Sequence, residues 1–133
     1  MRVAIVHYHL APGGVTRVIE TTSQVLTNAG VPHVILTGDN VTGLGYLTNS
    51  SGLTAGELLA NLRAAATAAL GGPPDIWHFH NHSLGKNLLL PDLIARLADS
   101  GERLVLHIHD LAEAGRPANY PLIAGHPALY PFS

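Results

Sequence analysis

Four short and almost continuously apolar runs constrain the fold of this chain most: VAIV at 3–6, HVIL at 33–36, DIWHF at 75–79 and LVLHI at 104–108. Runs of this kind are typical of parallel strands that are covered on both faces. Between them lie segments in which apolar residues recur at helical spacing. Alternating strands and helices predict an α/β protein with a Rossmann-like parallel sheet and helices on both faces.

Two of the predicted helices carry clear local signals. Thr54 is followed three residues later by Glu57, which is a capping box and marks the start of a helix. Another helix is predicted to begin at Ser83 or Leu84, and Pro91 is expected either to kink it or to restart it.

The length of the chain fits one domain. Its 133 residues are 47 % hydrophobic, which suffices for a single core. We expect a Rossmann-like domain over residues 1–112, with a long surface loop at 37–52, followed by an irregular proline-rich tail at 113–133. A doubly wound domain usually has about six strands, whereas the alternation here stops after the fourth. We therefore expect the tail to begin a continuation, so that the chain is part of a longer protein.

Composition excludes several classes of function. The formal net charge is −2 and the seven lysines and arginines are scattered, so the chain has no basic stripe that would follow a nucleic-acid backbone. It has no cysteine, which removes disulfides and thiolate metal sites. The apolar start is too short for a secretory signal, and no apolar stretch reaches the ~20 residues that span a bilayer. We expect a cytoplasmic protein with no membrane span and no nucleic-acid partner.

Two adjacent glycines follow the first predicted strand. Gly13 and Gly14 lie in the stretch APGGVTRVIE, between that strand and the next helix. Free amides and the positive end of the helix dipole favour an anion at such a position, and glycine lets a ligand approach the backbone closely. The dinucleotide and P-loop fingerprints are both absent from the sequence. An anion site and an ordinary tight turn both fit this pattern.

Histidines occur in His-x-His pairs at the ends of three predicted strands, at His7/His9, His78/His80 and His107/His109. In open α/β sheets, ligands bind beyond the carboxyl ends of the strands. Imidazole is a common ligand of zinc and related ions, so a metal site is conceivable. However, the one clear carboxylate among the strand-end groups is that of Asp110, and strand-end imidazoles often serve only as hydrogen-bonding groups. We therefore expect no native metal.

His109 and Asp110 are the most economical candidates for a catalytic site. They stand at the end of the fourth predicted strand, just before the chain becomes irregular. An imidazole at this point can donate a hydrogen bond to a sugar hydroxyl, or act as an acid or base near neutral pH. The competing interpretation is a histidine that caps the strand end. Lys86 is an isolated cation, and such side chains are mostly solvated.

Three motifs taken together resemble a known family. They are the glycine turn Pro12-Gly13-Gly14, the strand DIWHFH at 75–80 and the strand end HIHD at 107–110. In this order and spacing the chain resembles, over residues 1 to about 112, the amino-terminal domain of a group 1 (family 4) glycosyltransferase of the GT-B fold. The family usually has threonine where this chain has His107.

The resemblance implies two Rossmann-like domains that face each other across a cleft, of which this chain supplies the acceptor side. It implies that the amides of Gly13 and Gly14 approach the diphosphate of a nucleotide-sugar donor, and that His109 contacts the donor sugar. It also implies that His80 and Asn81 help to shape the acceptor pocket, together with the loop at 38–52.

Members of the family are retaining enzymes that need no metal or other cofactor, because a basic pair and a helix dipole in the second domain neutralise the leaving diphosphate. The nucleotide site lies in that second domain, so the resemblance implies that this chain does not turn over substrate by itself. The donor sugar, its nucleotide and the acceptor stay open.

Two other functions and one mode of assembly remain open. The histidine pairs suggest a metal-dependent hydrolase, and the glycine turn suggests a non-catalytic module that binds a phosphorylated small molecule. A domain with an uncovered cleft face would also associate with itself, so we expect a homodimer formed through that face or through the alanine-rich helix at 54–70.

Overall fold

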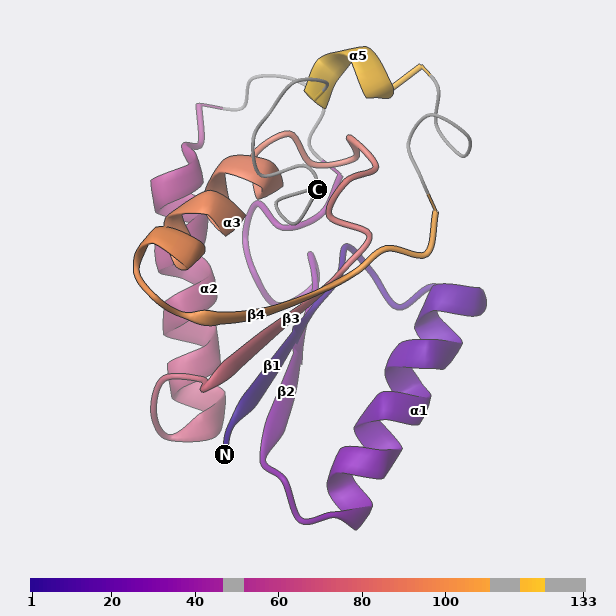
Figure 1. The fold of residues 1–133 in the computed structure, drawn as a ribbon, viewed down its shortest axis with the longest axis vertical. Helices are drawn as coiled ribbons and strands as arrows, with labels where there is room; N and C mark the ends of the chain where they lie inside the picture. Colours follow the sequence, from indigo (N-terminus) through magenta and orange to yellow (C-terminus); the bar gives the residue numbers. More distant parts are fainter. Residues whose placement is uncertain (47–51, 111–117, 124–133) are drawn as a thin grey trace.

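The computed structural model describes residues 1–46, 52–110 and 118–123. Three helices separate four strands along the chain, and a short helical turn follows (Figure 1). The elements are β1 (Val3–Val6), α1 (Gly14–Asn28), β2 (His33–Leu36), α2 (Ala55–Leu70), β3 (Ile76–His80), α3 (Leu90–Asp99), β4 (Arg103–His107) and α5 (Tyr120–Ile123).

The four strands form one parallel sheet in the order β2-β1-β3-β4. The chain first moves outward from β1 to β2, and then crosses back past β1 to β3 and on to β4. The direction of winding therefore reverses between β1 and β3, which is the topological switch point where open α/β sheets bind ligands. The α/β class and the parallel Rossmann-like sheet predicted from the sequence are confirmed.

Helices lie on both sides of this sheet, as predicted, but they cover it unequally. Figure 1 shows α1 on one side and α2 with α3 on the other. The larger apolar core lies under α2 and α3, where Trp77 and Phe79 of β3 pack against both helices. The smaller core lies on the α1 side and centres on Val3, Ile5 and Ile19. On that same side, Val105 of β4 is 45 % exposed.

Local signals fix the ends of the second helix as predicted. Thr54 accepts a hydrogen bond from the Glu57 amide, and the Glu57 side chain accepts one from the Thr54 amide, which completes the capping box. At the other end, Gly71 adopts a left-handed conformation that stops the helix.

The predicted start of the third helix at Ser83 or Leu84 is wrong, because α3 begins at Leu90 with Pro91 in its first turn. Gly85 is left-handed and interrupts any earlier helix. The Asn87 amide nitrogen donates hydrogen bonds to the backbone oxygens of Gly43, Leu44 and Gly45, so it ties this segment to the loop after β2.

Most of the tail predicted at 113–133 lies outside the described residues, as does part of the predicted loop, at 47–51. Within the tail the structure describes residues 118–123, which include the helical turn α5. In the parts of the chain that are described, no helix is long and apolar enough to cross a membrane.

Candidate functional site

A pocket of about 170 Å³ opens at the carboxyl ends of the strands, at the switch point of the sheet. Three segments that are far apart in the sequence line it. The segment after β1 contributes His7, His9 and Gly13, the segment after β3 contributes Asn81, and the segment after β4 contributes Asp110. The glycine turn, the residue directly after the DIWHFH strand and the last residue of the HIHD motif therefore meet at one place.

Gly13 and Gly14 form one wall of this pocket, where α1 begins. Neither glycine has a positive φ in the range that favours glycine, and a Cβ added to either would meet no atom within 4 Å. The fold itself therefore does not require glycine at these positions. The missing side chains leave the first amides of α1 open to a ligand, which suits an anion.

Asn81 organises the ends of β3 and β4. It is 2 % exposed and has a φ of 54°, which asparagine tolerates better than most residues. Its Oδ1 accepts hydrogen bonds from the amides of His109 (2.8 Å) and Asp110 (3.2 Å). Its backbone oxygen accepts a 2.6 Å hydrogen bond from the Tyr8 hydroxyl. Burial raises the pKa of Tyr8, so this hydroxyl stays protonated and keeps donating.

A small network of side chains forms the rim of the pocket. His9 Nε2 lies 2.8 Å from the Tyr46 hydroxyl, which also accepts a 3.0 Å hydrogen bond from Lys86 Nζ. The Lys86 ammonium lies 4.8 Å from the centre of the Tyr46 ring. Lys86 is thus held beside the pocket and supplies it with a positive charge, although an isolated lysine in the sequence suggested only a solvated side chain.

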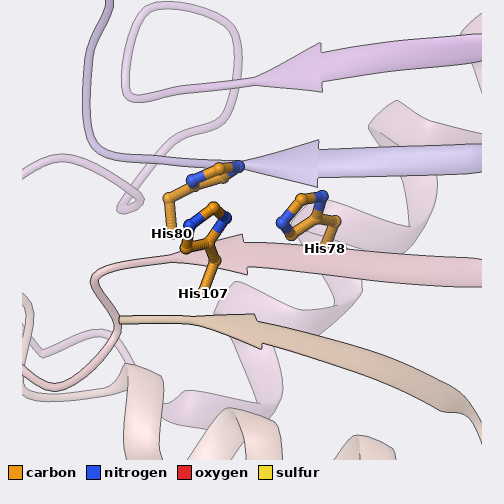
Figure 2. A group of neighbouring side chains, drawn as sticks. All are labelled: His78, His80 and His107. Atoms are coloured by element: carbon orange, nitrogen blue, oxygen red, sulfur yellow. The ribbon is translucent and has the colours of Figure 1, made fainter. Parts of the chain in front are cut away.

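Four histidines form a cluster along the ends of β3 and β4, on the α1 side of the sheet: His78, His80, His107 and His109. The ring centres of His107 and His109 are 4.1 Å apart, and those of His78 and His80 are 4.3 Å apart. His80 Nδ1 lies 2.9 Å from His109 Nε2, within hydrogen-bonding distance. Figure 2 shows three of the rings gathered where the two strands end.

Burial favours the neutral form of four histidines of this region, His7, His78, His80 and His109. Desolvation, and after it the charge repulsion of the neighbouring imidazoles, lowers the pKa of His80 to about 3. Desolvation also lowers the pKa of His78 and His109. His7 is 5 % exposed, and its pKa falls to about 4 for the same reason, although its hydrogen bond to the His80 backbone oxygen opposes the shift.

The structure separates the residues singled out from the sequence into two groups. Gly13, Gly14, Asn81 and Asp110 line the pocket. His80 and His109 do not; His80 is 1 % exposed, and His109 is half-buried with its Nε2 against His80 Nδ1.

Sequence reasoning assigned no role to His7, His9, Tyr46 or Lys86, which all belong to the pocket or its rim. The His-x-His spacing did mark the first two as a pair at a strand end. Nothing in the local sequence marks Tyr46 or Lys86, because their partners lie 37 and 40 residues away along the chain.

Comparisons with protein-family models, with curated proteins and with solved structures found no match to this chain. The family resemblance therefore depends on the three motifs alone.

Proposed function

We propose that this chain is the acceptor-side domain of a retaining glycosyltransferase that uses a nucleotide-sugar donor. The observation that carries the proposal is the meeting of the glycine turn, Asn81 and Asp110 in one pocket at the switch point of the sheet. The glycine turn and Asp110 belong to two of the motifs that resemble the family, and Asn81 directly follows the third, DIWHFH at 75–80. Their meeting was not required by any one of the motifs.

The pocket offers the groups that a diphosphate needs. The open amides at Gly13 and Gly14 are hydrogen-bond donors at the positive end of the α1 dipole. Lys86 adds a positive charge at the rim. The Asp110 carboxylate would repel a phosphate placed next to it, so we assign Asp110 to the sugar hydroxyls, for which a carboxylate is a good acceptor.

His109 is assigned to the donor sugar, near the reacting carbon. Its backbone is fixed by Asn81, and its imidazole is neutral at pH 7 because burial and His107 lower its pKa. Its Nε2 lies against His80 Nδ1, so its Nδ1 is the nitrogen left to bond a sugar hydroxyl. We further assign Asn81 and His80 to shaping the acceptor side, with His80 acting through its contact with His109.

Catalysis in this proposal needs a second domain that holds the nucleotide, and this chain alone is expected to bind a donor weakly and to transfer nothing. A cytoplasmic location and self-association through the cleft face or through α2 stay predictions. Light scattering at high concentration tests the self-association, and a monomer would contradict it.

The first test is calorimetry with the chain, using pyrophosphate, a panel of nucleoside diphosphate sugars and the free sugars. We expect heat from the diphosphates and none from the sugars alone. Gly14→Val should abolish this heat without unfolding the chain, since a side chain there meets no protein atom within 4 Å. Thr21→Val, an exposed position on the same helix, is the matched control.

The second test uses the enzyme with its second domain. His109→Ala and Gly14→Val should each reduce sugar transfer at least tenfold, whereas Thr21→Val should not. Unchanged transfer in both variants would overturn the assignment of these residues. Binding of simple phosphorylated molecules without any transfer would instead favour the non-catalytic binding module.

A further inference from the structure

We propose that His78, His80 and His107 form a binding site for one divalent transition-metal ion of the zinc class. The three side chains come from two adjacent strands, since His78 and His80 lie on β3 and His107 lies on β4. They gather on the same side of the sheet (Figure 2). The site is separate from the pocket described above, because none of the three residues lines that pocket.

Parallel pairing brings these residues together. His80 is the register partner of His107, and His78 lies two residues before His80 on the same face of β3. One ligand nitrogen from each histidine lies within 4.8 Å of the other two. The point best placed between three such atoms is at most ~2.8 Å from each, and a Zn–N bond is about 2.0–2.1 Å. Moving each nitrogen inward by up to about 0.7 Å brings all three within bonding distance. The rings lie 3° to 31° from parallel, so side-chain rotation must also turn them until their lone pairs converge on the ion.

Two buried histidine nitrogens without a hydrogen-bond partner in the described part of the chain also support the metal site. The Nε2 atoms of His78 and His80 are buried, and neither has a hydrogen-bond partner among the residues that the structure describes. His80 as a whole is 1 % exposed. A buried polar atom without a partner is costly, so native proteins rarely retain one without a reason. A metal ion bound by both atoms would supply that reason.

His109 contacts His80, one of the three proposed ligands, at the ring nitrogen that would not bind the metal. Its Nε2 lies 2.9 Å from His80 Nδ1, on the far side of the His80 ring from the unpaired Nε2. When His80 Nδ1–H donates a hydrogen bond to His109 Nε2, the lone pair of His80 Nε2 is left for a metal. Ligand histidines are commonly oriented in this way through the ring nitrogen that does not bind the ion.

The ligand set indicates which ion fits. Three neutral imidazoles suit Zn²⁺, Co²⁺, Ni²⁺ or Cu²⁺, whereas Mg²⁺ and Ca²⁺ require oxygen ligands. Three protein ligands also leave a fourth position for water or another molecule, as in catalytic zinc sites. The ion can enter from the α1 side of the sheet, where Val105, the register partner of His78, is 45 % exposed.

Cobalt and zinc titrations of the untagged chain, stripped with a chelator, test this proposal. We expect one Co²⁺ per chain with the intense visible absorption of a tetrahedral site, and displacement of Co²⁺ by one equivalent of Zn²⁺. X-ray absorption of the zinc form should count three imidazole nitrogens. Zn²⁺ should also raise the midpoint of thermal unfolding, because an ion that binds only the folded state stabilises it.

Substitutions of single histidines test which of them bind the ion. His78 and His107 are only half-buried, so replacing either by alanine is tolerated better than replacing His80. His78→Ala and His107→Ala should each weaken Zn²⁺ binding by more than about tenfold, since loss of a supporting residue alone costs about that much. His33→Ala is the matched control, because His33 begins β2 at the opposite end of the sheet and pairs with Ser23. It should leave binding unchanged.

Two results would overturn the proposal. The first is a wild-type chain that binds no Zn²⁺ or Co²⁺ in either titration. The second is a folded His78→Ala/His107→Ala double variant that binds the ion as tightly as the wild type, which would place the metal elsewhere. Circular dichroism of every variant without metal shows whether it has folded.

Discussion

The two faces of the sheet carry different kinds of side chain from the same strands. On β3, Trp77 and Phe79 point to the face under α2 and α3 and are 0 % and 1 % exposed. The residues that alternate with them, His78 and His80, belong to the histidine cluster on the opposite face. β4 repeats the pattern, with Leu104 and Leu106 packed against the larger core.

One face of the sheet therefore stabilises the fold, and the other carries the polar groups. The face under α2 and α3 is apolar and fully packed, and hydrophobic burial of this kind is the main driving force of folding. The α1 face has a small apolar core and holds one buried and three half-buried imidazoles at the carboxyl ends of β3 and β4. A rigid packed face thus holds polar groups in place on the other, where they would not be stable by themselves.

The largest effect should come from the packed face. Trp77→Ala removes a fully buried indole and leaves a cavity, so the free energy of unfolding should fall by about 3–5 kcal/mol in a urea titration. It also removes the 3.1 Å hydrogen bond from the indole Nε1 to Glu102. Val105→Ala on the other face should change stability by less than about 0.5 kcal/mol, because Val105 is already exposed. Equal losses in both variants would contradict the comparison.

Acid should lower the stability of the fold through its buried histidines. In the folded chain the pKa values of His80 and His7 are about 3 and about 4, whereas in the unfolded chain both are about 6.5. The unfolded state therefore binds more protons between pH 6.5 and pH 4, so stability falls as the pH falls through this window and is independent of these groups above it. The expected loss between pH 7 and pH 5 is about 2–4 kcal/mol.

Urea titrations at a series of pH values, in the presence of a chelator, measure this loss. His80→Gln should flatten the dependence of stability on pH. The control Phe79→Leu, on the apolar face, should lower stability at every pH without changing the slope. If wild-type stability stays constant down to pH 5, the two histidines are not buried in neutral form.

A smaller loss of stability is expected from substitutions of Asn81, which connects the histidine cluster to the pocket. Asn81→Ala leaves the amides of His109 and Asp110 without their acceptor and puts alanine at a φ of 54°, which asparagine tolerates better, so it should cost about 1–3 kcal/mol. Asn81→Gly removes the same side chain but tolerates the backbone conformation. The difference between the two variants therefore measures the backbone strain, and the loss in Asn81→Gly measures the hydrogen bonds.

Much of the architecture could be predicted because its signals are local. The apolar runs located all four strands, and the Thr54–Glu57 capping box and Gly71 set the limits of α2. The third helix was predicted too early. Gly85 is a local signal against the earlier start, whereas Asn87 acts over a distance. Asn87 bonds to backbone oxygens 42 to 44 residues away, and such contacts leave no periodic pattern in the sequence.

The sequence by itself determined the parallel α/β sheet, the glycine turn and the presence of histidines at strand ends, because each depends on neighbouring residues and on strand or helix periodicity. Only the tertiary structure decided which of these histidines meet. The parallel register joined His80 to His107, the strand order brought Gly13 and Asn81 to one pocket, and folding of the loop after β2 placed Tyr46 against Lys86. Register and strand order follow from the packing of the whole sheet, so no single segment contains them.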